Sequence, residues 1–146
     1  MCSLLPPAQA PSSHPVEVGQ RSEAIIQAEL VKRGYRVLVP FGINHRYDFV
    51  LDCGDRFIKA QCKTGRLRHG VIEFSAQSVR ANTHRAYFRG YDGEIDLFLV
   101  YCPGTRKVYA VPIEDATKSK VALRVDPPAN NQQLRVRWAH EYELPA

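Results

Sequence analysis

Apolar and polar residues alternate in two runs within residues 46–63, on either side of Gly54 and Asp55. The apolar positions are Tyr47, Phe49, Leu51 and Cys53 in the first run and Ile58, Ala60 and Cys62 in the second. A period of two is typical of half-buried strands, and Gly-Asp between two strands favours a two-residue turn. The pattern therefore predicts a β-hairpin.

The register of this hairpin follows from the match of apolar positions across its two strands. The apolar pairs are Leu51 with Ile58, Phe49 with Ala60 and Tyr47 with Cys62. A slip by one residue would break all of these pairs. The same count sets Asp48 opposite Gln61, and opposed Cβ atoms lie about 5 Å apart. Asp48, Gln61 and Lys63 are therefore predicted to cluster on the polar face of the hairpin.

Patterns elsewhere predict the remaining elements. A helix is expected over residues 20–33, because its apolar residues recur on one side and Gly34 suits a left-handed helix end. Further strands are expected at 35–40, 71–74, 95–101, 107–113 and 121–125, and further helices from 75 to about 87 and over 134–142. Residues 1–18 are expected to be a disordered tail, and residues 19–146 a single domain.

Composition narrows the class of protein. The chain has 146 residues, of which 45% are hydrophobic and 24% charged, as is usual for a globular protein. No apolar run is long enough for a membrane-spanning helix, and Pro6 and Pro7 interrupt the apolar N-terminal stretch, which disfavours a secretory signal. None of the four cysteines forms a CxxC pair. We expect a protein without a membrane partner, in a reducing, cytoplasmic and nucleoid-associated setting.

The positive charge of the chain is concentrated in one segment. The net charge is +5, and residues 63–89 contain a single acid, Glu73. The basic residues of this segment are Lys63, Arg66, Arg68, Arg80, Arg85 and Arg89. A concentrated positive field suits a polyanion such as DNA, although a solvated basic face explains the same pattern. On the first interpretation, DNA phosphates are contacted by Arg66, Arg68, Arg80, Arg85 and Arg89.

The first predicted helix brings a second carboxylate toward the polar face of the hairpin. Glu23 lies on the same helical stripe as Ile26 and Leu30, so it is expected at the sheet edge within reach of Asp48. The carboxylates of Glu23 and Asp48 suit Mg²⁺, and the side-chain oxygen of Gln61 or a nearby backbone carbonyl can complete the ligand set. Lys63 can then orient the attacking water or neutralise the transition state of phosphodiester hydrolysis.

Each of these residues also has a structural explanation. Glu23 near a helix start interacts favourably with the helix dipole, and Asp48 can pair with Lys63 or Arg46. We interpret Asp96 as an edge or structural acid. His45 and His84 could contact phosphate, but lone histidines usually do not carry the mechanism. The matched strand faces, the register and the basic segment together favour the catalytic interpretation.

The order Glu, Asp and Gln-x-Lys resembles the PD-(D/E)XK nuclease superfamily, and more closely its group I intron-encoded homing endonucleases. The matching stretches are GQRSEAIIQAELVKRGYRVLVPFG, YDFVLDCGDRFIKAQCKTGR, YDGEIDLFLVYCPGTRKVYAVPIEDA and LRVDPPANNQQLRVRWAHEYEL, which span nearly all of residues 19–144. The most specific part is YD followed by QxKT. Tyr47 stands where the superfamily has proline. Gln61 stands where the superfamily has an acid, and the homing subgroup similarly carries glutamine at this position.

The resemblance implies an α/β, restriction-endonuclease-like core in the order helix, three strands, helix, strand. This core has a mixed central sheet and a C-terminal β/helix extension. The catalytic positions of the family fall on Glu23, Asp48, Gln61 and Lys63, with Glu23, Asp48 and Gln61 as metal ligands. The resemblance further implies an endonuclease of the homing type that cuts double-stranded DNA with Mg²⁺, for which Mn²⁺ can substitute.

Cutting both strands is simplest for two symmetry-related subunits, so we expect a homo-oligomer, either a dimer or a tetramer. Two other functions stay open at this stage. One is a structure-selective nuclease, such as a junction resolvase or a repair or defence enzyme. The other is a DNA-binding module without catalytic activity, which the presence of Asp48 and Lys63 disfavours.

Overall fold

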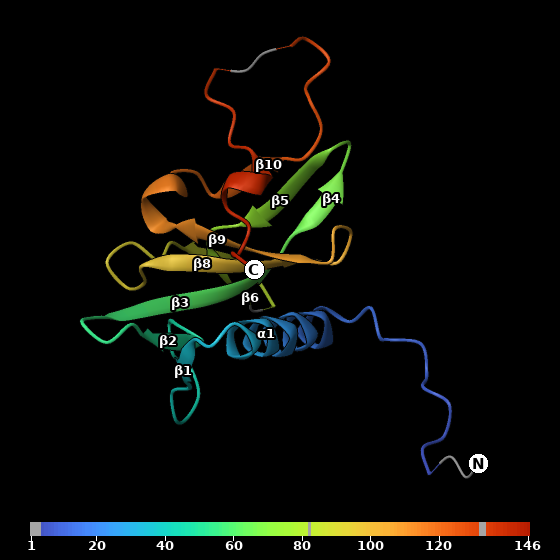
Figure 1. Cartoon of the computed structure of the whole chain (residues 1–146), viewed down its shortest axis with the longest axis vertical. Helices are drawn as coiled ribbons and strands as arrows, with labels where there is room; N and C mark the ends of the chain where they lie inside the picture. Colours follow the sequence, from blue (N-terminus) through green and yellow to red (C-terminus); the bar gives the residue numbers. More distant parts are fainter. Residues whose placement is uncertain (1–3, 82, 132–133) are drawn as a thin grey trace.

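The computed structural model describes residues 4–81, 83–131 and 134–146. One helix, α1 (Pro15–Lys32), lies along one face of a five-stranded sheet (Figure 1). The sheet order is β1-β2-β3-β8-β9, with β1 (Arg36–Leu38), β2 (Phe49–Asp52), β3 (Phe57–Thr64), β8 (Leu97–Cys102) and β9 (Lys107–Pro112). Only β3 and β8 pair in parallel; the other neighbouring strands of this sheet are antiparallel. The fold is therefore mixed α/β, as predicted.

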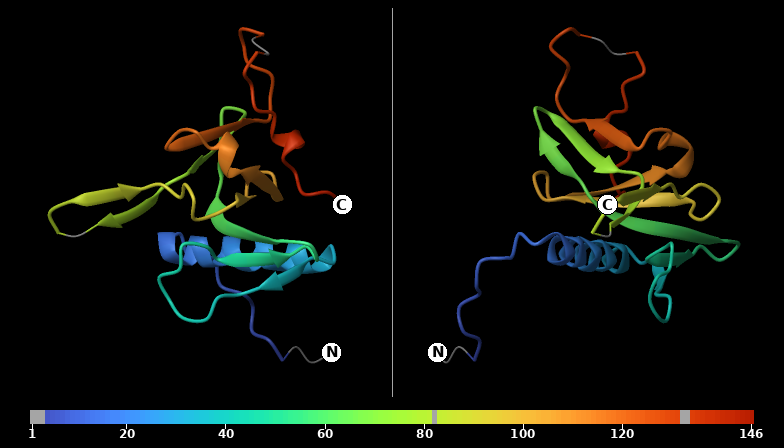
Figure 2. Two further views of the ribbon diagram at one scale, coloured as in Figure 1. Left: turned by 90° about the vertical axis from the view of Figure 1, so that its left-hand side faces the viewer. Right: turned by 180° about the vertical axis from the view of Figure 1, so that it is seen from behind.

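A second sheet and a projecting hairpin complete the molecule. The three-stranded sheet has the order β10-β5-β4, with β4 (Arg66–Arg68), β5 (Val71–Ser75) and β10 (Lys120–Arg124). It lies on the side of the central sheet away from α1 (Figure 1). Strands β6 (Ser78–Ala81) and β7 (Ala86–Arg89) form a separate hairpin. This hairpin, which we name the arm, projects from the body of the molecule (Figure 2, left view).

Two apolar cores hold these layers together. The core between α1 and the central sheet contains Ile26, Leu30, Phe49, Ala60 and Leu99. Along the helix, buried positions recur every fourth residue at Ser22, Ile26 and Leu30. The core on the other face of the sheet contains Ile72, Phe74, Phe98, Val100, Val121 and Leu123. Each core residue excludes apolar surface from water, which is the main favourable contribution to folding.

The central hairpin has the predicted register. Phe49 pairs with Ala60 and Leu51 pairs with Ile58. Gly54 has a positive φ of 86°, a conformation that favours glycine. Strands β5, β8, β9 and β10 were also predicted correctly, and their ends lie within two residues of the predicted ones. The short strand β4 was not predicted.

Helix α1 begins at Pro15, earlier than the predicted start at residue 20. Proline at the first helical position is favoured because its missing N–H needs no partner there. The imidazole of His14 accepts a hydrogen bond from the Val16 amide at 3.4 Å. The last residues of the expected tail therefore belong to the helix, while residues 4–14 form no helix or strand.

The helix predicted from residue 75 to about 87 is wrong. Apart from residue 82, which lies outside the described residues, this segment contains the end of β5, strand β6 and the start of β7. Val79 pairs with Phe88, and Arg80 pairs with Tyr87. β-Branched and aromatic side chains are favoured in such cross-strand pairs.

The helix predicted over residues 134–142 is also wrong. Only a short 3-10 helix, Ala139–Glu141, forms there. Arg135 has a positive φ of 62°, which is incompatible with a right-handed helix. The Arg124 amide donates instead to the carbonyl of Arg137 at 2.7 Å, so this segment extends the second sheet. Within the described ranges, no helix is long and apolar enough to cross a membrane.

Candidate active site

The carboxylate of Asp48 lies where strand β2 begins beside β3. The Asp48 amide donates to the carbonyl of Ala60 at 2.8 Å, and the Asp48 Oδ2 atom accepts from the Cys62 amide at 2.8 Å. These two bonds extend the hairpin by one residue and fix the side chain. Burial raises the pKa of the Asp48 carboxyl, although the Cys62 amide and the Lys63 charge act to lower it. Asp48 is therefore a fixed and incompletely neutralised carboxylate.

Glu23 approaches Asp48 from the helix. Burial, and then the negative charge of Asp48, raise the pKa of the Glu23 carboxyl. The two carboxylates line one cavity of about 200 Å³. The rest of this cavity wall comes from the segment that leads into β2, namely Val39, Pro40, Gly42, Ile43, Asn44, His45 and Tyr47. Two like charges beside one cavity favour a cation between them.

A buried hydrogen bond fixes the helix against the strand at this point. The hydroxyl groups of Ser22 and Thr64 lie 2.6 Å apart, and Ser22 is buried. Ser22 directly precedes Glu23, and Thr64 directly follows Lys63. This contact, which the sequence did not reveal, therefore sets the helix that carries Glu23 at a definite position along β3.

Gln61 lies on the opposite face of β3 from the helix. Its neighbour Ala60 packs under α1, and residues alternate between faces along a strand. The side-chain oxygen Oε1 of Gln61 is buried and has no hydrogen-bond partner within the described residues. A buried polar atom without a partner costs about 1–3 kcal/mol. Such an oxygen is suited to binding a hard cation. Together with the carboxylates of Glu23 and Asp48 it makes a set of oxygen donors whose chemistry suits a divalent metal, although Gln61 is not among the residues that line the cavity of the two carboxylates.

Lys63 shares the face of Gln61 and is held by two contacts. Its Nζ atom donates to the carbonyl of Gln77 at 3.0 Å and lies 5.0 Å from the centre of the Tyr91 ring. Burial lowers the pKa of the Lys63 amine; the charge of Asp48 opposes this shift, and that of Arg46 adds to it. The ammonium group thus lies within electrostatic range of Asp48, with a reduced cost of giving up its proton.

Arg46 and Tyr91 extend this cluster, and sequence reasoning missed their roles. The Arg46 side chain donates to Glu94 Oε2 at 2.5 Å, to Ser78 Oγ at 2.7 Å and to the carbonyl of Gly90 at 2.5 Å. Its guanidinium carbon lies 4.0 Å from the centre of the buried Tyr91 ring. The sequence had offered Arg46 as a partner for Asp48, but the structure pairs it with Glu94. Only long-range folding brings these residues together.

The remaining candidates lie elsewhere. The Asp96 carboxylate accepts from the Lys59 amide at 2.8 Å, which supports its interpretation as a structural acid. The predicted DNA-contacting arginines fall into two groups, with Arg66 and Arg68 on β4 and Arg80 and Arg89 on the arm. Arg85 lies between the two arm strands.

Among residues 4–81, 83–131 and 134–146, no cluster of three or more His, Cys, Asp or Glu side chains is placed to hold a metal ion.

The chain is similar to known proteins over most of its length. A family model described as PD-(D/E)XK endonuclease matches residues 13–145. Among solved structures, the chain is similar to a bacterial homing endonuclease, I-Ssp6803I. The TM-score is 0.70 and the sequence identity 20%, over 90% of this chain and 89% of the other. Comparison with curated protein sequences finds no match. At this identity, the structural likeness establishes the fold.

Proposed function

We propose, on the premise that this chain belongs to the PD-(D/E)XK endonuclease family, that it hydrolyses phosphodiester bonds in double-stranded DNA with the help of a divalent metal. The observation that carries the proposal is the meeting of Glu23 and Asp48 at one cavity, each with a raised pKa. The buried, unpartnered oxygen of Gln61 on the strand opposite Asp48 supports it.

Glu23, Asp48 and Gln61 would hold the metal, which we propose to be Mg²⁺, with Mn²⁺ as a substitute. All three offer oxygen ligands, which this hard cation prefers. When bound, such an ion polarises the phosphoryl group and offsets its developing negative charge. The fixed position of Asp48, held by the Cys62 amide, keeps one ligand oriented before the metal or the DNA arrives.

In this proposal Lys63 acts on the reacting phosphate. Its ammonium group is held by the Gln77 carbonyl over the Tyr91 ring. A fixed positive charge at this place stabilises the transition state without reorganisation. Because burial lowers the Lys63 pKa, the same group can also exchange a proton with the attacking water or the leaving oxygen more readily than an exposed lysine.

We further propose that the enzyme is of the homing type, encoded within a group I intron, and assembles as a homo-oligomer. The likeness to a bacterial homing endonuclease over 90% of this chain supports the homing type. The described residues offer one candidate site per chain, which supports the homo-oligomer, because two symmetry-related subunits are the simplest way to cut two antiparallel strands.

The test compares three DNA substrates in the presence of Mg²⁺. They are a long random duplex, a duplex from the locus that flanks the gene, and a four-way junction. We expect specific cutting of the flanking-locus duplex and loss of cutting in Asp48→Asn. The control Asp55→Asn changes an exposed acid in the hairpin turn and should cut normally. Preferred cutting of the junction would contradict the homing function, and tight binding without any cutting would contradict nuclease activity.

A further inference from the structure

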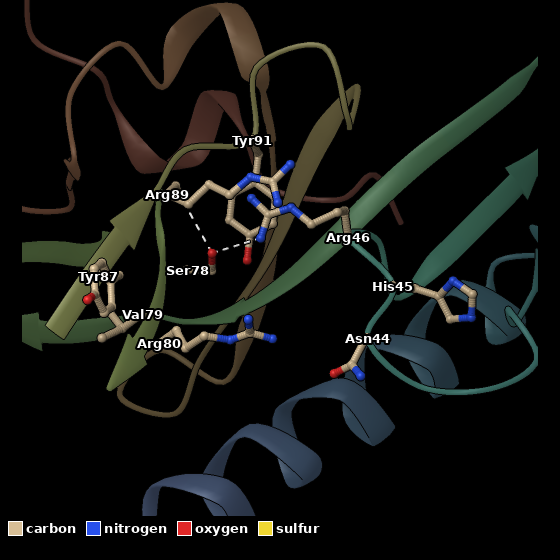
Figure 3. Close-up of a pocket in the computed structure, with 9 residues that line it drawn as sticks. All are labelled: Asn44, His45, Arg46, Ser78, Val79, Arg80, Tyr87, Arg89 and Tyr91. Atoms are coloured by element: carbon tan, nitrogen blue, oxygen red, sulfur yellow. Dashed lines mark hydrogen bonds between the residues drawn. The ribbon is translucent and has the colours of Figure 1, made fainter. Parts of the chain in front are cut away.

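A second, larger cavity lies between the arm and the segment that leads into the candidate active site (Figure 3). Its volume is about 600 Å³. The segment contributes Asn44, His45 and Arg46 to its wall, and the arm contributes Ser78, Arg80 and Arg89. It is also lined by the buried ring of Tyr91. Cationic and hydrogen-bonding groups therefore line a cavity that is bordered by the arm and by the segment that leads into β2.

One wall of this cavity is rigid. Arg46 makes a side-chain contact with Glu94, a hydrogen bond to Ser78 and a close contact with the Tyr91 ring. Arg89 donates to the other carboxylate oxygen of Glu94 at 2.6 Å. Two guanidinium groups thus share a single carboxylate, so this wall keeps a net positive charge while its side chains stay fixed.

Arg80 supplies a further cation at this cavity. Figure 3 shows its side chain extending from the arm toward the segment that carries Asn44 and Arg46. Within the described residues, no acidic side chain pairs with it. Three arginines line the cavity, and two of them share Glu94, so positive charge is in excess there and favours an anion.

The cavity adjoins the candidate active site. Asn44 and His45 line both this cavity and the smaller one that Glu23 and Asp48 border. Arg46 lies only two residues before Asp48, and two residues of extended chain span about 7 Å. A phosphate held beside Arg46 and Arg80 is therefore within a few nucleotides of one held at Asp48.

We infer that this cavity binds a backbone phosphate of the DNA strand whose scissile bond lies at Asp48, with Arg80 as the principal ligand. The inference rests on the proposed nuclease function and adds a second anchoring point for the same strand. Arg46 forms the preorganised wall, and a guanidinium group donates to phosphate oxygens in a bidentate manner. Two anchors on one strand fix its direction across the site.

The first test measures DNA binding and needs no cleavage. The affinity of a 30-base-pair duplex is measured by anisotropy in Ca²⁺ at several salt concentrations. Arg80→Gln should weaken binding about tenfold and reduce the slope of log K against log salt by about 0.9. The control Arg36→Gln removes another exposed cation, on β1 beside Asp52, and should change neither. An unchanged slope for Arg80→Gln would overturn the inference.

The second test locates the phosphate. Single neutral methylphosphonates are placed along the cut strand of a duplex that the protein cleaves. At one position within a few nucleotides of the cut, the substitution should weaken wild-type binding about tenfold but leave Arg80→Gln binding unchanged, because both changes remove the same contact. Additive effects at every position would overturn the inference. If the wild-type protein binds DNA with an unreduced slope of log K against log salt but never cleaves it, the proposed nuclease function is contradicted while the phosphate site is supported.

Discussion

At the residue scale, some features of the candidate site could be predicted from the sequence and others could not. The register of the hairpin, in which Phe49 pairs with Ala60, was predictable because alternation and turn chemistry are local properties of the sequence. The approach of Glu23 followed from its helical stripe. The contacts of Lys63 with Gln77 and Tyr91 could not be predicted, because the chain returns to β3 only through tertiary folding.

Lys63→Ala should abolish metal-dependent cleavage while DNA binding stays nearly intact. The amine is fixed near Asp48, and loss of one such transition-state contact typically costs about 10²–10³ in rate. A nicking assay and a gel shift on the same preparation measure the two properties separately. Lys59→Ala is a suitable control, because Lys59 lies on the same strand near its other end. Full activity of Lys63→Ala would mean that the site lies elsewhere.

Glu23→Gln should make the metal-free protein more stable at neutral pH although it loses cleavage. Burial and Asp48 raise the Glu23 pKa, so the ionised form is disfavoured in the folded state. The contribution of the Glu23 carboxyl to the free energy of unfolding of the wild type is fully present below pH 4.5, its ordinary pKa. This contribution is lost as the pH rises through the raised pKa of the folded state. Thermal melts in EDTA should show a gain at pH 7 that disappears at pH 4. A loss of stability at pH 7 would contradict this electrostatic account.

Gln61→Glu should fold, because the two side chains are nearly equal in size. Without metal, the new carboxylate opposes Asp48 across the strand pair, which is destabilising. The metal-free variant should therefore melt below the wild type, and Mg²⁺ should stabilise it more than the wild type because a carboxylate is the stronger ligand. Melting curves across a Mg²⁺ titration test both effects. Identical curves for the two proteins would remove Gln61 from the metal site.

At the element scale, strands with strong local patterns were predictable and the arm was not. The strands that form the arm contain few alternating apolar residues. Part of what holds the arm to the body is the contact of Arg46 with Ser78 and Gly90. The C-terminal segment was mispredicted for a comparable reason, since it is fixed by pairing of Arg124 with Trp138 rather than by its own periodicity.

The passage from β3 to β4 depends on a glycine. A Cβ atom at Gly65 would lie 2.7 Å from the Ile72 side chain and 3.0 Å from that of Val100. Gly65→Ala should therefore destabilise the protein by about 1–3 kcal/mol through overpacking. Gly19→Ala is the matched control, because nothing lies within 4 Å of its added Cβ in α1, and it should stabilise by about 0.5–1 kcal/mol. Equal urea midpoints for the two variants would contradict this account.

At the scale of the whole molecule, each chain offers one candidate site, and the proposed assembly has a kinetic consequence. If two subunits cut one duplex together, supercoiled plasmid should become linear with little free nicked intermediate. Mixing wild type with an excess of the Asp48→Asn variant should then yield mainly nicked circles, because mixed oligomers cut only one strand. Sedimentation of the same mixtures measures the subunit number. Linear product in proportion to the wild-type fraction alone would contradict cooperation between subunits.

The parallel pairing of β3 with β8 has a consequence for how the chain reaches this structure. Residues 65–96, which include β4, β5 and the arm, lie between the two strands in sequence. The chain must close this long loop before the contact forms, and contacts between distant residues slow folding. Helix α1 and strands β1 to β3 are joined by much shorter connections. An early folding intermediate should therefore contain this half, with one edge of β3 unpaired and open to aggregation until β8 arrives.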